Sequence, residues 1–136
     1  MEKWKMEEPY VGAHIRVLSN GVYHHGIFIG DDQVIQFGGP FDMFYNPEDI
    51  KVEQVHISKF LNQGFLEVRK FSFLEKRKKN KDSLIVEIAK SKLGEKGYHI
   101  LNNNCEHFVN YCIFNKKTSA QVDDIRAEVK NKLGIK

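Results

Sequence analysis

The chain has 136 residues, of which 41% are hydrophobic and 12% aromatic, enough for one domain with a buried core. No run of about 18 apolar residues occurs, which excludes a membrane-spanning helix. The charged first eight residues also lack the apolar stretch of a secretory signal. The net charge of +3, from 21 Lys and Arg against 18 Asp and Glu, is too small to indicate a nucleic-acid partner. We therefore expect an intracellular, cytoplasmic domain.

The first half of the chain predicts strands. Residues 1–11 form a charged leader with little expected structure, and the domain proper is predicted over 12–117. Alternating apolar residues bounded by turn residues predict strands at 14–18, 22–29, 33–37, 55–60 and 65–73. A long loop or flap is expected over 40–54.

The second half predicts helices. One begins at Asp82 and stops at Gly94, a second carries both cysteines, and an amphipathic helix within 118–136 packs on the domain. Strands followed by helices indicate an α+β fold with an antiparallel sheet of about four to six strands. Between the halves, Lys76–Lys81 holds five positive charges in six positions. It is interpreted as a solvated linker, and the alternative is peripheral contact with an anionic membrane.

Cys105 and Cys112 lie on one apolar helical face. Seven residues of helix separate their Cα atoms by about 10.5 Å, too far for a disulfide, so both thiols are expected to be reduced. Cys112 is predicted to be a core residue. With Asn103 as N-cap and Glu106 completing a capping box, Cys105 falls in the first turn, where the helix dipole favours a thiolate. Cys105 is then either a nucleophile or another buried core cysteine, and a partner base must decide.

The candidate base is a histidine on the second predicted strand. His107 follows Cys105 by two residues and points about 200° away from it on a helix, which excludes it. His24 and His25 occupy opposite faces of the strand. Gly26, on the face of His24, leaves room for another backbone to approach, so His24 is favoured. His25 and His14 are interpreted as satisfied or exposed side chains.

Gln36 is the polar residue that would orient the imidazole of His24. A two-residue loop at residues 31–32 pairs residue 27 with 36 and puts Gln36 on the wrong face of the sheet. A three-residue loop at residues 30–32 pairs residue 26 with 36, so that His24 and Gln36 share a face. We predict the second register, and the alternative is that Gln36 is a surface amide.

These segments resemble the lecithin:retinol acyltransferase-like family, which includes H-Ras-like phospholipases and acyltransferases within the permuted NlpC/P60 papain-like superfamily. The resemblance is carried by Tyr23–Asp31 (YHHGIFIGD), Val34–Gln36 (VIQ) and Asn104–Val109 (NCEHFV), and runs from about Gly12 to Phe114. It implies that Cys105 is the nucleophile of an acyl-enzyme and His24 its general base. The family's third polar group is often a second histidine, which aligns with Gln36.

The resemblance also implies phospholipid or related acyl donors. The backbone N–H of Cys105 is a candidate oxyanion donor, and Tyr23 is a candidate helper, although a regular strand turns it away from His24. An apolar cluster in the flap either receives an acyl chain or is ordinary core: Phe41, Met43, Phe44 and Tyr45. This chemistry needs no cofactor. The Cys and His spacing is not that of a zinc site.

Two other functions stay open from the sequence. One is a thiol amidase or peptidase that acts on isopeptide or peptidoglycan-like bonds. The other is a catalytically silent binding module of the same fold, for which the glutamine at position 36 is the supporting feature.

Overall fold

The computed structural model describes residues 2–38, 46–99 and 104–115 and contains an antiparallel six-stranded sheet. The strand order is β1-β6-β2-β3-β4-β5. The strands are β1 (Lys3–Lys5), β2 (His14–Ser19), β3 (Val22–Gly30), β4 (Gln33–Phe37), β5 (Val52–His56) and β6 (Glu67–Lys70). The helices are α1 (Ile57–Leu61), α2 (Phe73–Lys78), α3 (Asp82–Ser91) and α4 (Cys105–Phe114), with a 3-10 turn at Pro47–Asp49. The predicted α+β class with an antiparallel sheet is confirmed, whereas the permuted papain-like architecture stays a prediction.

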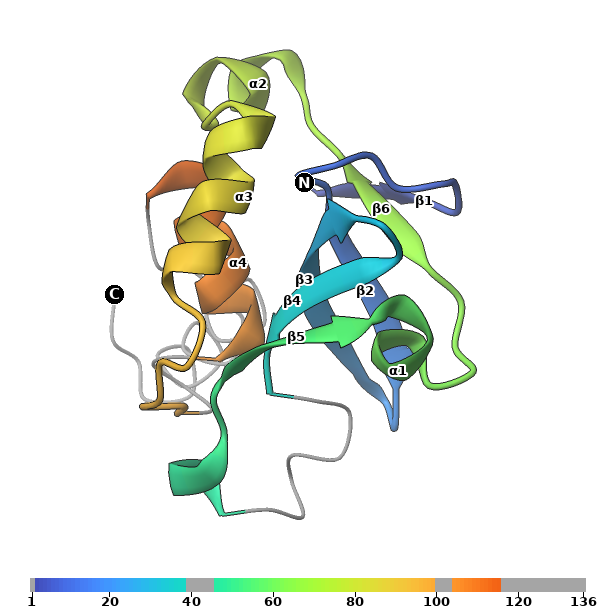
Figure 1. Ribbon diagram of the computed structural model, residues 1–136. Coiled ribbons are helices and arrows are strands. Elements are labelled where there is room, and N and C mark those ends of the chain that lie inside the picture. The colour runs from blue at the N-terminus through green and yellow to red at the C-terminus, as the bar shows by residue number, and fades with distance from the viewer. Residues whose placement is uncertain (1, 39–45, 100–103, 116–136) are drawn as a thin grey trace, which may run out of the picture.

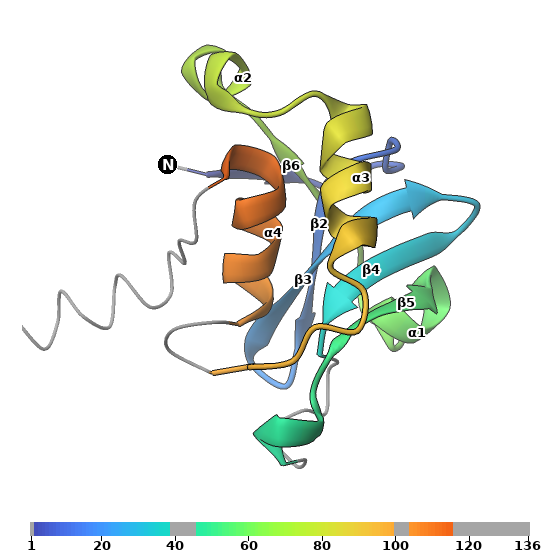
Figure 2. The ribbon, with the colours of Figure 1, turned by 60° about the vertical axis from the view of Figure 1, so that its left-hand side comes forward.

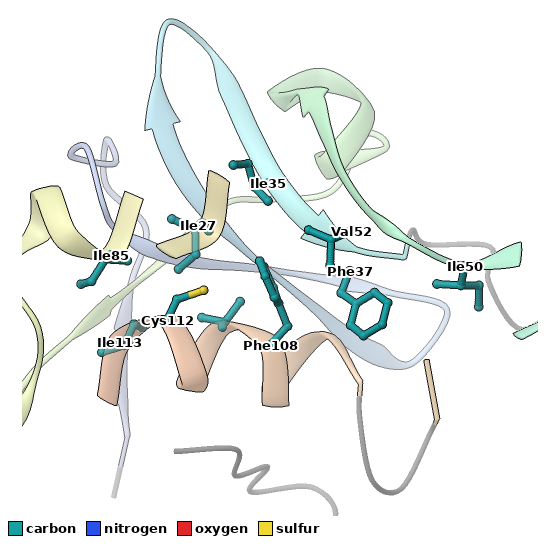
Figure 3. Packing of buried hydrophobic residues seen from close by; sticks show 11 residues of the cluster. Ile27, Ile35, Phe37, Ile50, Val52, Ile85, Phe108, Cys112 and Ile113 are labelled. Carbon is teal, nitrogen blue, oxygen red and sulfur yellow. The ribbon is translucent and has the colours of Figure 1, made fainter. Parts of the chain in front are cut away.

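Strand alternation gives the sheet two apolar faces, each with its own cluster of buried side chains. Helices α3 and α4 cover one face, where Ile27 and Ile35 meet Phe108 and Cys112 (Figure 3). Helix α1 covers the other face, where Phe60 packs among buried valines. Figures 1 and 2 show α3 and α4 beside each other on one side of the sheet and α1 on the opposite side. Any residue of β3 or β4 can therefore be assigned to the α4 face or to the α1 face.

The segment expected to be an unstructured leader contains a strand. β1 pairs with β6 at the sheet edge, and Trp4 lies directly opposite Arg69. The ring of Trp4 packs edge-on against the ring of His14 at 4.8 Å between centroids and lies under the Arg16 guanidinium. These contacts hold β1 on the sheet. The prediction of an unstructured leader is wrong because it considered only the charge of this segment.

The expected strand at 55–60 is wrong in its position. β5 begins earlier, at Val52, and ends at His56, and the chain then turns into α1. The side chain of His56 accepts a hydrogen bond from the backbone N–H of Ser58 at 3.1 Å, which caps the helix. Phe60 is then buried from a helix instead of from a strand.

The expected strand at 65–73 is also shorter than predicted, because Phe73 begins α2. Ser72 and Glu75 form a capping box at the start of this helix. Part of the basic run predicted to be a linker is the last turn of α2, where cations are favourable at the negative end of the helix dipole. α3 runs from Asp82 to Ser91, so it begins where predicted but ends three residues before Gly94. Asp82 is its first residue and not its cap: the N-cap is Lys81, which makes no side-chain capping hydrogen bond.

Two expectations lie outside the described residues: the apolar cluster of the flap and the final amphipathic helix. The longest helices within the described ranges, α3 and α4, have ten residues each. In this part of the chain no helix is long and apolar enough to cross a bilayer.

Candidate active site

Cys105 is the first residue of α4 and is half-buried. The N-cap is Asn104, one residue later than predicted, because its Oδ1 accepts from the backbone N–H groups of Glu106 and His107, both at 3.0 Å. His107 Nδ1 accepts in return from the Asn104 N–H at 3.2 Å, so His107 takes the place in the capping box that was assigned to Glu106. The thiol remains in the first turn, at the positive end of the helix dipole.

His24 is buried in β3, on the α1 face of the sheet. Its Nε2 lies 2.8 Å from Oε1 of Gln36, which is itself fully buried. Gln36 Nε2 in turn donates to Oε1 of Glu53 at 3.0 Å. The His24 ring also packs against Phe60 of α1, with 4.8 Å between ring centroids. Imidazole, amide and carboxylate therefore form one hydrogen-bonded row across β3, β4 and β5.

The predicted register between β3 and β4 is confirmed, although its cause differs. Gly26 pairs with Gln36, as expected from a three-residue loop. The turn itself has two residues, Asp31 and Asp32, both with positive φ of 50° and 57°. A β-bulge between Phe28 and Gly30 absorbs one residue and restores the pairing that brings Gln36 beside His24.

Burial holds the pKa of His24 below its ordinary value, because the interior disfavours the charged imidazolium. The hydrogen bond to Gln36 and the nearby carboxylate of Glu53 act in the opposite direction and raise the pKa. His24 is therefore neutral near neutral pH, which is the state a general base needs.

Cys105 and His24 lie at the same end of the sheet. β4 pairs with β3 only from Gly26 onward, so His24 extends past the end of β4. Phe37, the last residue of β4, packs against Phe108 with 6.3 Å between ring centroids, which places the first turns of α4 at that end. Strand alternation turns His24 toward the α1 face, while α4 covers the other face. Cys105, at the start of α4, and His24, on β3, therefore lie at one shared end of the sheet.

His25 faces α4 and belongs to a separate polar row. Arg69 donates to His14 Nδ1 at 3.3 Å, so His14 Nε2 carries a proton and donates to His25 Nδ1 at 2.8 Å. His25 Nε2 then points toward Glu106 of α4, with 3.8 Å to Oε2. Arg69 also donates to Asn110 Oδ1 at 3.1 Å, and this hydrogen bond connects the row to α4.

Both histidines of this row are neutral in the folded protein. Burial, and then the neighbouring histidine and arginine charges, lower the pKa of His14 well below its ordinary value. The same causes lower the pKa of His25 to about 3. Both histidines are buried. The expectation of a satisfied side chain holds for His14, whereas for His25 it is wrong at one atom, because the buried Nε2 has no hydrogen-bond partner among the described residues.

Tyr23 does not lie with His24. Its ring packs under the Arg16 guanidinium, 3.8 Å from the centroid, on the face that also carries His25. Glu53 and Arg69 are the polar residues that sequence reasoning missed. Glu53 falls on the face of Gln36 once the strand is recognised to begin at Val52, because the sequence analysis places residues 52–54 in the loop.

Cys112 is a core residue, as predicted. It is fully buried, and burial raises the pKa of its thiol to about 12, so it is not a nucleophile. It forms no disulfide with Cys105. Within the described ranges, no group of three or more His, Cys, Asp or Glu side chains is arranged to hold a metal ion.

The sequence model of the lecithin retinol acyltransferase family matches residues 7–118, and the chain belongs to this family. It is 28% identical over 127 residues to lecithin retinol acyltransferase of Rattus norvegicus, covering 79% of this chain and 55% of that protein. It is 27% identical over 135 residues to phospholipase A and acyltransferase 4 of Homo sapiens, covering 90% and 80%. The match to lecithin retinol acyltransferase of Bos taurus has 28% identity over 139 residues and covers 88% and 60%. The chain thus spans little more than half the length of the two lecithin retinol acyltransferases.

Proposed function

We propose that this chain catalyses acyl transfer or hydrolysis through a thioester on Cys105, with His24 as general base and Gln36 orienting His24. The observation that carries the proposal is the buried hydrogen bond of 2.8 Å between His24 and Gln36 at the end of the sheet where α4 begins. A neutral imidazole held by a third group is the arrangement that activates a thiol nucleophile.

The chemistry balances with these residues alone. His24 takes the proton of the Cys105 thiol, and the thiolate attacks the acyl carbonyl carbon of the donor. The tetrahedral intermediate collapses to a thioester, and His24 returns the proton to the departing oxygen. Water, an alcohol or an amine then gives a proton to His24 and attacks the thioester carbon, which releases the thiolate. The backbone N–H of Cys105, at the positive end of α4, is the proposed oxyanion donor.

We infer a phospholipid or related acyl ester as the donor, because two of the relatives are named for lecithin and for phospholipase A. Tyr23 lies under Arg16 on the face opposite His24, so the backbone donor has the stronger support. The alternative donor is an amide, in an isopeptide or a cell-wall-like bond. A silent binding module of the same fold is the alternative without turnover.

The test is intact-protein mass spectrometry after incubation with a short-chain phosphatidylcholine. The protein should gain the mass of one acyl group, and Cys105→Ala should gain none while keeping its thermal unfolding transition. Cys112→Ala is the matched control, because it removes the other thiol and should leave acylation unchanged. Acylation of Cys105→Ala would contradict the proposal. The absence of both adduct and released fatty acid with the unaltered protein would favour the amidase or the binding module.

We also propose peripheral contact between the segment Lys76–Lys81 and an anionic membrane. Glu75 fixes α2 to the domain through Arg69, with 2.7 Å between Oε2 and the guanidinium nitrogen. The helix leaves Phe73 and Leu74 exposed beside these cations, an arrangement suited to a lipid surface. Sedimentation with phosphatidylserine vesicles should be lost in a Phe73→Ser, Leu74→Ser double variant, and unchanged sedimentation would contradict the contact. The cytoplasmic location and the packing of the final helix on the domain stay predictions.

A further inference from the structure

We infer that Glu53 is a positioning residue that fixes the amide of Gln36 and thereby selects the protonated nitrogen of His24. The inference rests on the proposed role of His24 as the base. Glu53 then becomes the fourth residue of the site, after Cys105, His24 and Gln36. It lies on β5, a strand that the sequence analysis did not connect with the site. The row runs from the His24 imidazole through the Gln36 amide to the Glu53 carboxylate.

The orientation of the Gln36 amide depends on the group that it contacts on the side away from His24. A glutamine side chain can present either its oxygen or its nitrogen to a neighbour, and the two orientations differ by a half-turn. With Oε1 toward His24, Nε2 points at Oε1 of Glu53, 3.0 Å away. After the half-turn, the amide oxygen would face a carboxylate, which only accepts hydrogen bonds. Gln36 is fully buried, so water does not compensate for that repulsion.

The amide orientation in turn determines the tautomer of His24. Gln36 Oε1 only accepts, so at 2.8 Å the Nε2 atom of His24 must carry the proton and donate it. A neutral imidazole has one protonated nitrogen, and its lone pair is then on Nδ1. Nδ1 is thus the atom that accepts the proton of the thiol.

The sheet fixes the position of the carboxylate. Gln36 and Glu53 are direct cross-strand partners in β4 and β5, so their side chains leave the same face. The buried residues Val52 and Val55 hold β5 in that register. The negative charge of Glu53 also raises the pKa of His24 against the effect of burial. Glu53 therefore supports both the neutral tautomer and the imidazolium that forms during turnover.

Two variants separate the charge of Glu53 from its hydrogen bond. Glu53→Gln keeps the size and an acceptor oxygen but removes the charge, and Glu53→Leu removes both. Glu87→Gln removes the same charge from an exposed position on α3 and is the matched control. Thermal unfolding of each variant shows whether it is folded before any other measurement.

The first measurement is the ¹H–¹⁵N long-range spectrum of His24 in the full chain without substrate. It should show the Nε2–H tautomer in the unaltered protein and in Glu87→Gln. Glu53→Leu should show a mixture with the Nδ1–H form, and Glu53→Gln should lower the pKa at which His24 titrates. Persistence of the single tautomer together with an unchanged titration in both Glu53 variants would overturn the inference. Glu53→Gln keeps this test open if Glu53→Leu does not fold.

The second measurement is kcat/KM toward a short-chain phosphatidylcholine. Glu53→Leu should lower it about tenfold, the effect expected from losing one hydrogen bond. The same substitution should have a clearly smaller effect in a Gln36→Ala background, because only the direct effect of the Glu53 charge on His24 then remains to be lost. An equal loss in both backgrounds would contradict this route. Acylation of Cys105→Ala would refute the proposed function, whereas the tautomer measurement judges Glu53 independently.

Discussion

The ring of Phe60 in α1 fills the space above Gly26 in β3. A Cβ atom at residue 26 would lie 2.8 Å from Cε1 of Phe60 and 2.7 Å from Cγ1 of Val34. The sequence had suggested that Gly26 admits the backbone of the cysteine helix, and this expectation is wrong, because side chains occupy the space. Gly26 instead lets Phe60 pack closely beside His24, whose ring it also touches.

Gly26→Ala should destabilise the fold by about 1–3 kcal/mol, the usual effect of forcing an extra carbon into a packed core. Urea denaturation measures the free energy of unfolding. A second variant that combines Gly26→Ala with Phe60→Leu should recover part of the loss, since the smaller side chain makes room. An unchanged free energy of unfolding in Gly26→Ala would show that the core accommodates the added methyl group without loss of stability.

The strands next to the tight turns could be predicted from the sequence, whereas β1 was missed and β5 and β6 were predicted with wrong bounds. β2, β3 and β4 alternate clearly and are joined by short turns, so their local pattern defines them. β1 has three residues, and its pairing partner β6 (Glu67–Lys70) lies far away in the chain, while Trp4 packs on His14 and Arg16 of β2. Such long-range contacts leave no periodicity in the sequence.

The site, too, has one part that could be predicted from the sequence and one part that could not. His24 and Gln36 could be paired through hairpin parity, because one turn connects their strands. The bulge near Phe28 could not be predicted from the sequence. The register of β3 with β4 was therefore predicted correctly but attributed to a three-residue loop instead of to the bulge. Glu53 was missed because β4 and β5 are joined by a long loop, and a long loop does not define which residues of the two strands pair. The His14–His25 contact also depends on the pairing of β2 with β3, which no single strand pattern reveals.

His24→Ala should abolish acyl transfer, and His25→Ala should not. His24 is hydrogen-bonded to Gln36, whereas the His25 ring is buried on the α4 face, where its Nδ1 accepts from His14. His25→Ala should instead lower stability by about 1–3 kcal/mol, because His14 loses its buried acceptor. Acylation rates and thermal unfolding on both variants separate the two effects. The reverse result would make His25 the base and would put catalysis on the α4 face.

Gln36→His should preserve or raise activity. An imidazole at position 36 can still accept from His24 Nε2 and donate to Glu53, so the row of hydrogen bonds is kept. The measurement is kcat/KM for release of fatty acid, with Gln36→Leu as the variant that keeps the burial and loses both hydrogen bonds. Gln36→Leu should be strongly impaired. Total loss in a folded Gln36→His variant would show that the amide itself has a specific role.

The buried pair His14 and His25 should make the fold sensitive to mild acid. In the unfolded chain each histidine binds a proton once the pH falls below its ordinary pKa of 6.5. In the folded protein the pKa of both is lowered, for His25 to about 3, so both stay neutral at mildly acidic pH. Between these pH values the unfolded state binds more protons, so stability falls as the pH falls. Each histidine contributes at most about 1.4 kcal/mol per pH unit. His14→Gln keeps a donor that cannot ionise, and it should reduce the slope of unfolding free energy against pH between about 6 and 4.5. Urea denaturation across that range measures the slope, and equal slopes in the two proteins would assign the acid sensitivity to other groups.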